Sequence, residues 1–253
     1  MSAPAVVRLA GYVDGGSADG DRVRPVLVWA PGPGWRAIAS GVEGGGIGER
    51  RWWLNAHVDR DYRRTDPDRH VGEIAAGLHL TGPGVGLLTA ADVRHRTAAQ
   101  EAGVHAVATV GLGLPVRAAA PDDVVAAESA PGCPPAPGIL VPGTINVLVV
   151  VPVALTDAAL VNAVITVTEA KAQALGEAGV PGTGTSSDAV CIACPAVPAP
   201  GGTPEPFAGP RAPWGLRIAR TVHRAVADGT AGWLDRHPSG DEHRPWRRSS
   251  PPR

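Results

Sequence analysis

The sequence predicts an α+β fold, a single domain in which helices pack on a mixed β-sheet. Short apolar runs such as Pro25–Ala30 and Thr144–Val153 have the length and the β-branched composition of strands. Longer segments such as 157–178 carry apolar residues at helical spacing. Strands and helices intermingle without strict alternation, which favours a mixed sheet over a doubly wound parallel one.

The composition narrows the class of protein. The 253 residues suffice for a substantial core, and 44% of them are hydrophobic, as in ordinary globular proteins. A net charge of -1 indicates no polyanionic partner, so we expect no nucleic acid. The longest apolar runs are too short for a membrane span, no secretory signal pattern opens the chain, and three cysteines cannot form a disulfide framework. We therefore expect a cytoplasmic protein, with a homo-oligomer allowed.

Three regions differ in composition. Residues 1–24 are rich in Gly, Asp and Arg and are interpreted as a variable N-terminal segment. Residues 25–236 form the predicted domain, interrupted by a Pro-rich insertion at 118–142. Residues 237–253, rich in Pro, Arg and Ser, are expected to be a disordered tail.

Within the domain, the order of elements follows from local patterns. We expect strands at 25–30, 37–41, 52–58, 84–89, 104–112, 144–153 and 189–195, and helices opening at Asp66-Pro67, through 90–102, from Thr156 to Gly179 and at 215–228. Thr156 is the predicted N-cap of the third helix because its hydroxyl can accept a first-turn N–H, and Asp157 suits the positive end of the helix dipole. Gly179 and Pro181 end this helix.

Lys171 is the single lysine among 23 basic residues, and it falls on the apolar face of that helix, as does Thr168. Burying an ammonium is costly unless the charge is paired. Two interpretations remain: Lys171 snorkels or forms a structural ion pair, or it faces a cleft where it stabilises an oxyanion. Glu169 falls on the opposite, polar face, so both cannot line one pocket unless the helix is buried all round.

A loop of small and polar residues, 182–188, follows the helix and lets the backbone approach a ligand. It is not a phosphate loop, because no lysine follows and a helix precedes it. Cys191 and Cys194 form a C-x-x-C pattern on a predicted strand, where the two sulfurs point to opposite faces. Core packing is therefore favoured over zinc binding or redox chemistry.

Several ordered motifs carry a resemblance to a known family. These are G-T-I-N at 143–146, T-V-T-E-A-K at 166–171 and G-T-G-T at 182–185 followed by Asp188, with G-G-G at 44–46, N-A-H-V at 55–58, Tyr62, D-P at 66–67 and L-T-A-A at 88–91 in the first half. The chain resembles the adenosylcobinamide amidohydrolases from about residue 26 to 228. One departure is that Ser186-Ser187 separate Thr185 from Asp188, where the family usually reads T-G-T-G-T-D.

The resemblance implies hydrolysis of the amide that joins aminopropanol to a corrin side chain, giving adenosylcobyric acid for cobalamin synthesis. It implies no cofactor and no protein-bound metal, since cobalt enters with the corrinoid substrate. Two alternatives stay open: a non-catalytic corrinoid-binding protein and an amide hydrolase of another substrate.

Amide hydrolysis needs an activated nucleophile and a stabilised oxyanion. We expect Lys171 to be the stabiliser and Asp188 or Glu169 to accept the proton of water, with a covalent route through Thr183 or Thr185 as the alternative. The predicted substrate-binding residues are Asn55, His57, Gly143, Thr144, Asn146, Thr168, Gly182, Thr183 and Gly184. His57 shares a strand face with Asn55 and is a candidate general base or cobalt ligand.

Overall fold

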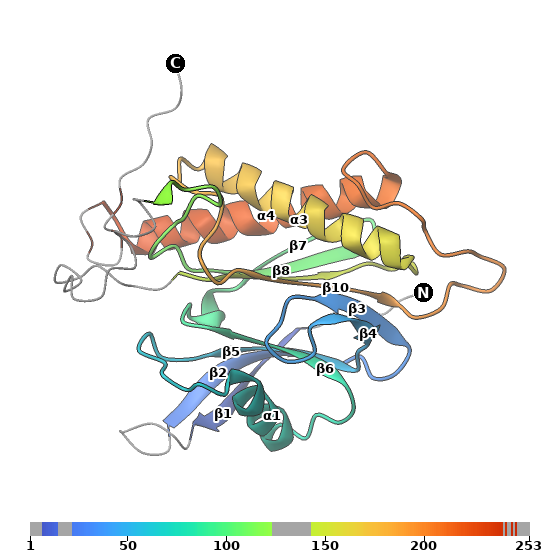
Figure 1. The fold of residues 1–253 in the computed structure, drawn as a ribbon, viewed down its shortest axis with the longest axis horizontal. Helices are drawn as coiled ribbons and strands as arrows, with labels where there is room; N and C mark the ends of the chain where they lie inside the picture. The colour runs from blue at the N-terminus through green and yellow to red at the C-terminus, as the bar shows by residue number, and fades with distance from the viewer. Residues whose placement is uncertain are drawn as a thin grey trace.

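Two β-sheets lie face to face at the centre of the molecule, and helices cover both outer faces (Figure 1). The computed structural model describes residues 7–14, 22–122, 143–239, 241, 244 and 246. The predicted insertion at 118–142 lies outside the described residues from position 123 onward.

The first sheet has the strand order β1-β2-β5-β6. Its strands are β1 (Arg8–Asp14), β2 (Arg22–Trp29), β5 (Trp52–His57) and β6 (Gly84–Thr89). The β5–β6 pair is parallel and the other pairs are antiparallel, so this sheet is mixed.

The second sheet has the strand order β4-β3-β10-β9-β8-β7. Its strands are β3 (Trp35–Ala39), β4 (Gly46–Glu49), β7 (Thr97–Glu101), β8 (Val104–Val110), β9 (Ile145–Val150) and β10 (Ala189–Pro195). Here β9 and β10 form the parallel pair, at the centre of the sheet.

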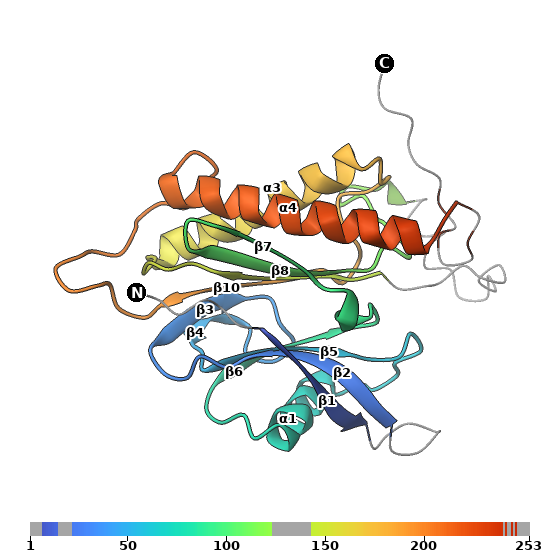
Figure 2. The same ribbon diagram turned by 180° about the vertical axis from the view of Figure 1, so that it is seen from behind.

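Helix α1 (Pro67–Gly77) packs on the first sheet, while α3 (Asp157–Glu177) and α4 (Pro213–Arg236) lie across the second (Figures 1 and 2). The layers are therefore helix, sheet, sheet and helix pair. A short 3-10 helix, η1 (Val93–His95), follows β6. Within the described ranges, no helix is long and apolar enough to cross a membrane.

The central strand β9 shows why the sequence folds this way. Ile145, Val147 and Val149 contact the helices, whereas Leu148 and Val150 pack between the two sheets. Because both faces are covered, the run is apolar almost throughout. Asn146 shares the inter-sheet face with Leu148, and this polar residue in an apolar interior marks the place where a site forms.

The α+β class and the mixed sheet are confirmed, but the structure has two sheets where one was expected. The helix predicted through 90–102 is wrong. Asp92 instead caps the single turn η1, and β7 follows as an edge strand beside β8. An edge strand has one exposed and one covered face. Over so few residues, its pattern of apolar and polar side chains fits the helical period as well as the strand period, which explains the error.

The structure differs from the expectations in the N-terminal segment, in the last helix and at one residue of the tail. β1 lies inside the segment 1–24 and pairs with β2 along its full length. Helix α4 extends eight residues beyond the expected 228, to Arg236. Within the predicted tail, Trp246 stacks on Trp233 and donates its indole N–H to the Leu112 carbonyl at 2.8 Å, so this residue packs on the domain.

Candidate active site

Asp188, the last residue before β10, joins three parts of the chain. Its Oδ1 accepts the backbone N–H of Ile145 at 2.9 Å and the hydroxyl of Thr185, and its Oδ2 accepts the backbone N–H of Thr185 at 3.1 Å. The Lys171 ammonium on α3 also donates to Oδ2. Four donors occupy the lone-pair positions of a carboxylate, so Asp188 has no free position for a further proton.

Lys171 forms a buried ion pair. The residue is 7% exposed, and its ammonium lies against Asp188 rather than at the surface. Gly184 makes the pair possible, because a Cβ there would lie within 3.0 Å of both Asp188 Oδ2 and Lys171 Nζ. Of the two interpretations of Lys171, the structure agrees with the structural ion pair. Glycine is required at position 184 because there is no room for a side chain.

Asn55 and Asn146 link the two sheets. Asn146 donates its side-chain amide to Asn55 Oδ1 at 2.9 Å and to the Leu88 carbonyl at 3.1 Å, while Asn55 donates to Thr109 Oγ1 at 3.0 Å. Since both partners of Asn146 Nδ2 are acceptors, the orientation of this amide is fixed. Its Oδ1 is buried and has no hydrogen-bond partner among the described residues. An unpaired acceptor in this position indicates a missing donor.

Two hydroxyls lie beside Asn146 and Asp188 in the chain. Thr144 Oγ1 and Ser187 Oγ are 2.8 Å apart, and Ser187 Oγ donates to the Gly143 carbonyl at 3.2 Å. Thr144 is buried, whereas Ser187 is exposed. A side chain at Gly143 would collide with the Gly111 carbonyl, so this glycine lets the segment before β9 pack closely.

These groups line one hollow, which we call the hydroxyl hollow. Its cavity volume is about 480 Å³, and its polar wall is formed by Thr89, Thr144, Asn146, Ser187 and Asp188, opposite Ser40 to Val42 and Tyr62. Lys171 is not part of the wall, because its ammonium lies on the far side of the Asp188 carboxylate.

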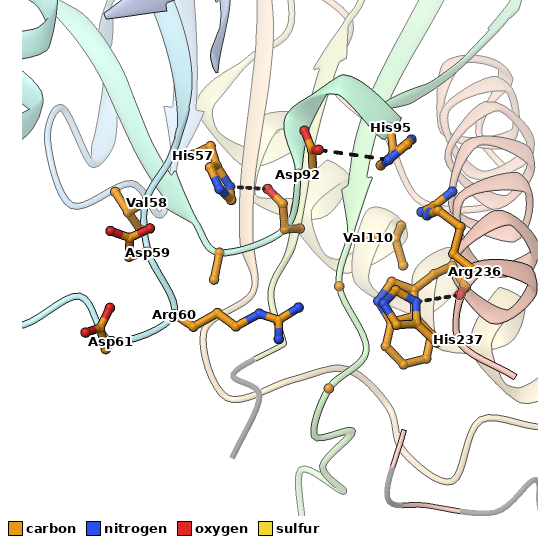
Figure 3. Close-up of a pocket in the computed structure, with 15 residues that line it drawn as sticks. His57, Val58, Asp59, Arg60, Asp61, Asp92, His95, Val110, Arg236 and His237 are labelled. Carbon is orange, nitrogen blue, oxygen red and sulfur yellow. Dashed lines mark hydrogen bonds and ion pairs between the residues drawn. The ribbon is translucent and has the colours of Figure 1, made fainter. Parts of the chain in front are cut away.

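A second hollow adjoins the first and is called the histidine hollow (Figure 3). It has a cavity volume of about 570 Å³ and is lined by His57, Asp92, His95, Trp233, Arg236 and His237, among others. Val58, Asp59, Arg60 and Ala90 line both hollows, so the two lie side by side.

His57 ends β5, on the same face as Asn55, as expected from strand alternation. Its Nδ1 lies 3.0 Å from the Ala91 carbonyl, which can only accept, so Nδ1 carries the proton and Nε2 presents a lone pair. Tyr12 donates its hydroxyl to the His57 carbonyl at 2.7 Å and fixes the backbone.

The remaining loop residues hold the loop in place. Thr183 is exposed and accepts the Ala118 N–H at 3.2 Å, and a side chain at Gly182 would collide with the Val116 backbone. The Thr185 hydroxyl is buried and donates to Asp188. Neither threonine lines either hollow, which disfavours the covalent route predicted through them.

Thr168 and Glu169 lie elsewhere. Both are exposed, and the Thr168 hydroxyl donates to the Val164 carbonyl of its own helix, so its predicted position on the apolar face is wrong. Glu169 lines a separate hollow between α3 and α4, together with Arg220 and His223. Because a helix turns about 100° per residue, Glu169 lies on a different face of α3 from Lys171 and is directed toward α4 and solvent.

Cys191 and Cys194 are buried on opposite faces of β10, in the inter-sheet core and the helix-side core respectively. Burial raises the pKa of the Cys191 thiol to about 12. Core packing of both cysteines is thereby confirmed. Over the ranges that the structure describes, no cluster of three His, Cys, Asp or Glu side chains could hold a metal ion.

Ser187 and Thr109 are site residues that the sequence reasoning missed. Ser187 was visible only as a departure within the G-T-G-T…D motif, and its inserted position is what brings its hydroxyl to Thr144. No sequence signal pointed to Thr109, whose partner Asn55 lies on the other sheet.

Comparison with known proteins gives a consistent result. The family model for adenosylcobinamide amidohydrolase matches residues 10–238. The adenosylcobinamide amidohydrolase of Halobacterium salinarum is 35% identical over 205 residues, covering 77% of this chain and 79% of its own. The adenosylcobinamide amidohydrolase of Methanosarcina mazei is 27% identical over 202 residues, covering 77% and 90%.

Among solved structures, the L-aminopeptidase D-Ala-esterase/amidase of Ochrobactrum anthropi aligns over 88% of this chain and 82% of its own. The sequence identity is 12% and the TM-score 0.38, so this likeness carries no argument about chemistry.

Proposed function

The chain belongs to the adenosylcobinamide amidohydrolase family, and from this premise we propose that it hydrolyses the aminopropanol amide of adenosylcobinamide in the hydroxyl hollow. The products are adenosylcobyric acid and aminopropanol, and the former re-enters cobalamin synthesis. The reaction needs no ATP, because water is the only co-substrate of an amide hydrolysis, and the proposal includes no cofactor of the protein. The cobalt arrives with the substrate.

One observation carries the assignment of the site: an unpaired buried acceptor and two hydroxyls line the same hollow. The bond to be cleaved is a secondary amide, which has one N–H donor. Among the described residues, Asn146 Oδ1 is a buried acceptor without a partner, and the amide is held in place by the two hydrogen bonds that its Nδ2 donates. An amide N–H of the substrate that enters the hollow would donate to this oxygen. Binding would then remove the cost of leaving the acceptor unpaired, which is about 1–3 kcal/mol.

Ser187 is the proposed nucleophile. Its hydroxyl is exposed in the hollow and 2.8 Å from Thr144 Oγ1. The Ser187 hydroxyl first turns its proton from the Gly143 carbonyl toward Thr144 Oγ1. Ser187 Oγ then attacks the carbonyl carbon, its proton moves to the Thr144 hydroxyl, and the Thr144 proton passes to the departing nitrogen as the C–N bond breaks. Aminopropanol leaves as the free amine, and water then hydrolyses the ester on Ser187 to release the carboxylate.

We propose that three residues position the reacting hydroxyls and do not contact the substrate: Lys171, Asp188 and Thr185. Asp188 fixes the Ile145 N–H next to Thr144 and directly follows Ser187, so the ion pair with Lys171 sets the separation of the two hydroxyls. The Lys171 ammonium holds the carboxylate in place through this contact. The predicted direct roles of Lys171 as oxyanion stabiliser and of Asp188 as base do not fit this arrangement as well.

We also propose that the protein works in the cytoplasm, as an enzyme of corrinoid salvage. The two free, buried cysteines of the described chain support a reducing compartment.

The experiment is an assay of the purified chain with adenosylcobinamide in the absence of ATP, with both products identified by mass spectrometry. Formation of adenosylcobyric acid and aminopropanol in equal amounts is the expected result. A simple N-alkyl amide serves as the comparison substrate. Equal turnover of the simple amide would point to a general amide hydrolase, and tight corrinoid binding without products would point to a binding protein.

A further inference from the structure

His57 is not among the residues to which the proposed hydrolysis assigns a role, but its ring is fixed by a hydrogen bond to the Ala91 carbonyl. It lines the histidine hollow (Figure 3), whereas the hydroxyl hollow is lined by Thr144, Asn146 and Ser187. Because His57 and Ser187 line different hollows, the imidazole is available for a role other than proton transfer at the scissile amide.

The imidazole is fixed by a chain of contacts. His57 Nδ1 donates to the Ala91 carbonyl, and the Ala91 N–H in turn donates to Thr89 Oγ1 at 3.0 Å. The adjoining Val58 N–H donates to the Thr89 carbonyl at 2.9 Å. The tautomer and the ring plane are therefore both set, and Nε2 has no hydrogen-bond partner in the described part of the chain.

A histidine whose Nδ1–H is held by a backbone carbonyl and whose Nε2 is free has the arrangement found for metal-binding imidazoles. No side-chain cluster of the described residues could hold a metal ion of its own. A corrinoid ligand brings its own metal, cobalt, which binds neutral imidazole well.

We propose that His57 Nε2 coordinates the cobalt of the substrate at its open axial position. This proposal rests on the proposed function. A cobinamide lacks the nucleotide base that occupies this position in cobalamin, so a water molecule is the ligand to be replaced. The Nε2 lone pair forms the new bond, the water leaves for solvent, and no electron is transferred.

The two hollows suit such a bipartite ligand. The corrin ring lies in the histidine hollow, and the side chain at its rim carries the amide past Val58 and Ala90, which both hollows share. Asp61, Asp92 and Arg236 at the wall of the histidine hollow offer acceptors and donors for the other amides of the ring edge. Coordination at His57 would fix which side chain reaches Ser187.

His237 is the rival in the same hollow. Its Nδ1 also lies near a carbonyl, that of Trp233, at 2.9 Å. Its ring stacks on Trp233, with ring centroids 4.3 Å apart, so one face is covered, and it has further contacts of its own. His57 sits instead at the end of a central strand, next to the residues that both hollows share.

The test uses electron paramagnetic resonance of cob(II)inamide bound to the wild-type protein near pH 8. A single axial nitrogen splits each high-field cobalt line into a triplet, and protein labelled with ¹⁵N-histidine should convert the triplet to a doublet. In His57→Ala the splitting should vanish and the Kd for cobinamide should rise about tenfold or more. His105→Ala, a histidine on β8 away from both hollows, should keep the splitting and the affinity.

The outcomes separate this proposal from the proposed function. Turnover of adenosylcobinamide by the wild type with no nitrogen splitting, or with splitting lost in His237→Ala and kept in His57→Ala, overturns the assignment of His57 and leaves the amidohydrolase intact. Absence of turnover overturns the proposed function itself. Circular dichroism and thermal melting of His57→Ala show whether the variant is folded, and His57→Gln provides a second variant that fills the same space.

Discussion

The ammonium of Lys171 on α3 donates to Asp188 Oδ2, and the same carboxylate accepts the backbone N–H of Ile145 at the start of β9. This relationship ties the helix layer to the strand that carries Thr144 and Asn146. Both side chains are largely buried, with exposed fractions of 9% for Lys171 and 12% for Asp188. The only lysine of the chain thus stabilises the site by holding a carboxylate in place.

Removing one partner of this pair should be more harmful than removing the charge from both. Lys171→Met leaves the Asp188 carboxylate buried without its counter-charge, so we expect a loss of about 3–5 kcal/mol in the free energy of unfolding. Asp188→Asn should cost a similar amount. The double variant Lys171→Met/Asp188→Asn should recover much of the loss and yet remain inactive, since the N–H groups of Ile145 and Thr185 lose their charged acceptor.

A double-mutant cycle from urea unfolding, with turnover measured on each variant, checks this expectation. The exposed pair of Arg220 with Glu101 is the control, and its loss should cost less than about 1 kcal/mol. Additive effects of Lys171 and Asp188 would show that the pair is not coupled. Full activity in Lys171→Arg would show that the fit of the lysine is unimportant.

Gly184→Ala should disrupt the same pair from the other side. The added methyl group would meet Asp188 Oδ2 and Lys171 Nζ within 3.0 Å, so we expect a loss of about 1–3 kcal/mol and a strong fall in turnover. Gly176→Ala on α3, where no atom lies within 4 Å of the added methyl, should instead be neutral or stabilising. Thermal melting of both variants decides, and equal melting temperatures would contradict the close packing at Gly184.

His70, which stacks on Tyr62 of the hydroxyl hollow, should make stability depend on pH. Burial lowers the pKa of this histidine, the nearby Arg64 lowers it further, and Asp14 opposes the change. Because the folded pKa is below the unfolded value of 6.5, the unfolded chain binds the proton first as pH falls. Stability should therefore decrease below about pH 6.5, by up to about 1.4 kcal/mol per pH unit, until the folded pKa is reached.

His70→Phe keeps the stacking on Tyr62 and cannot titrate. Its free energy of unfolding should depend less on pH between about 6.5 and the acid limit than that of the wild type. Urea unfolding of both proteins at several pH values provides the measurement, and parallel curves would remove His70 as the cause.

Local sequence patterns predicted most of the helices and strands, because these elements are determined largely by residues that are close in the sequence. The N-cap at Thr156 is an example: its hydroxyl accepts the Ala159 N–H at 3.1 Å, as predicted. The helix expected through 90–102 failed for the opposite reason, since Thr97–Glu101 is a strand only by virtue of pairing with β8. An edge strand is defined by its partner, and the partner is not visible in the local sequence.

Some residues of the site could likewise be predicted from the sequence, and others only became visible in the structure. Asn55, Asn146, Lys171 and Asp188 were found through their rarity or their motif, and the structure brings all four together. Glu169, two residues from Lys171 in the same motif, lies on another face because a helix turns about 100° per residue. Ser187 became a candidate only when the loop before β10 placed its hydroxyl next to Thr144.

The measurement that tests the account most directly is the turnover of adenosylcobinamide by Ser187→Ala, compared with its neighbour Ser186→Ala. Both serines are exposed in the same loop, but Ser187 alone of the two lines the hydroxyl hollow. We predict that Ser187→Ala loses at least about a thousandfold in kcat with an unchanged melting temperature, and that Ser186→Ala stays within a few-fold of the wild type. Activity of Ser187→Ala close to that of the wild type would contradict the proposed nucleophile.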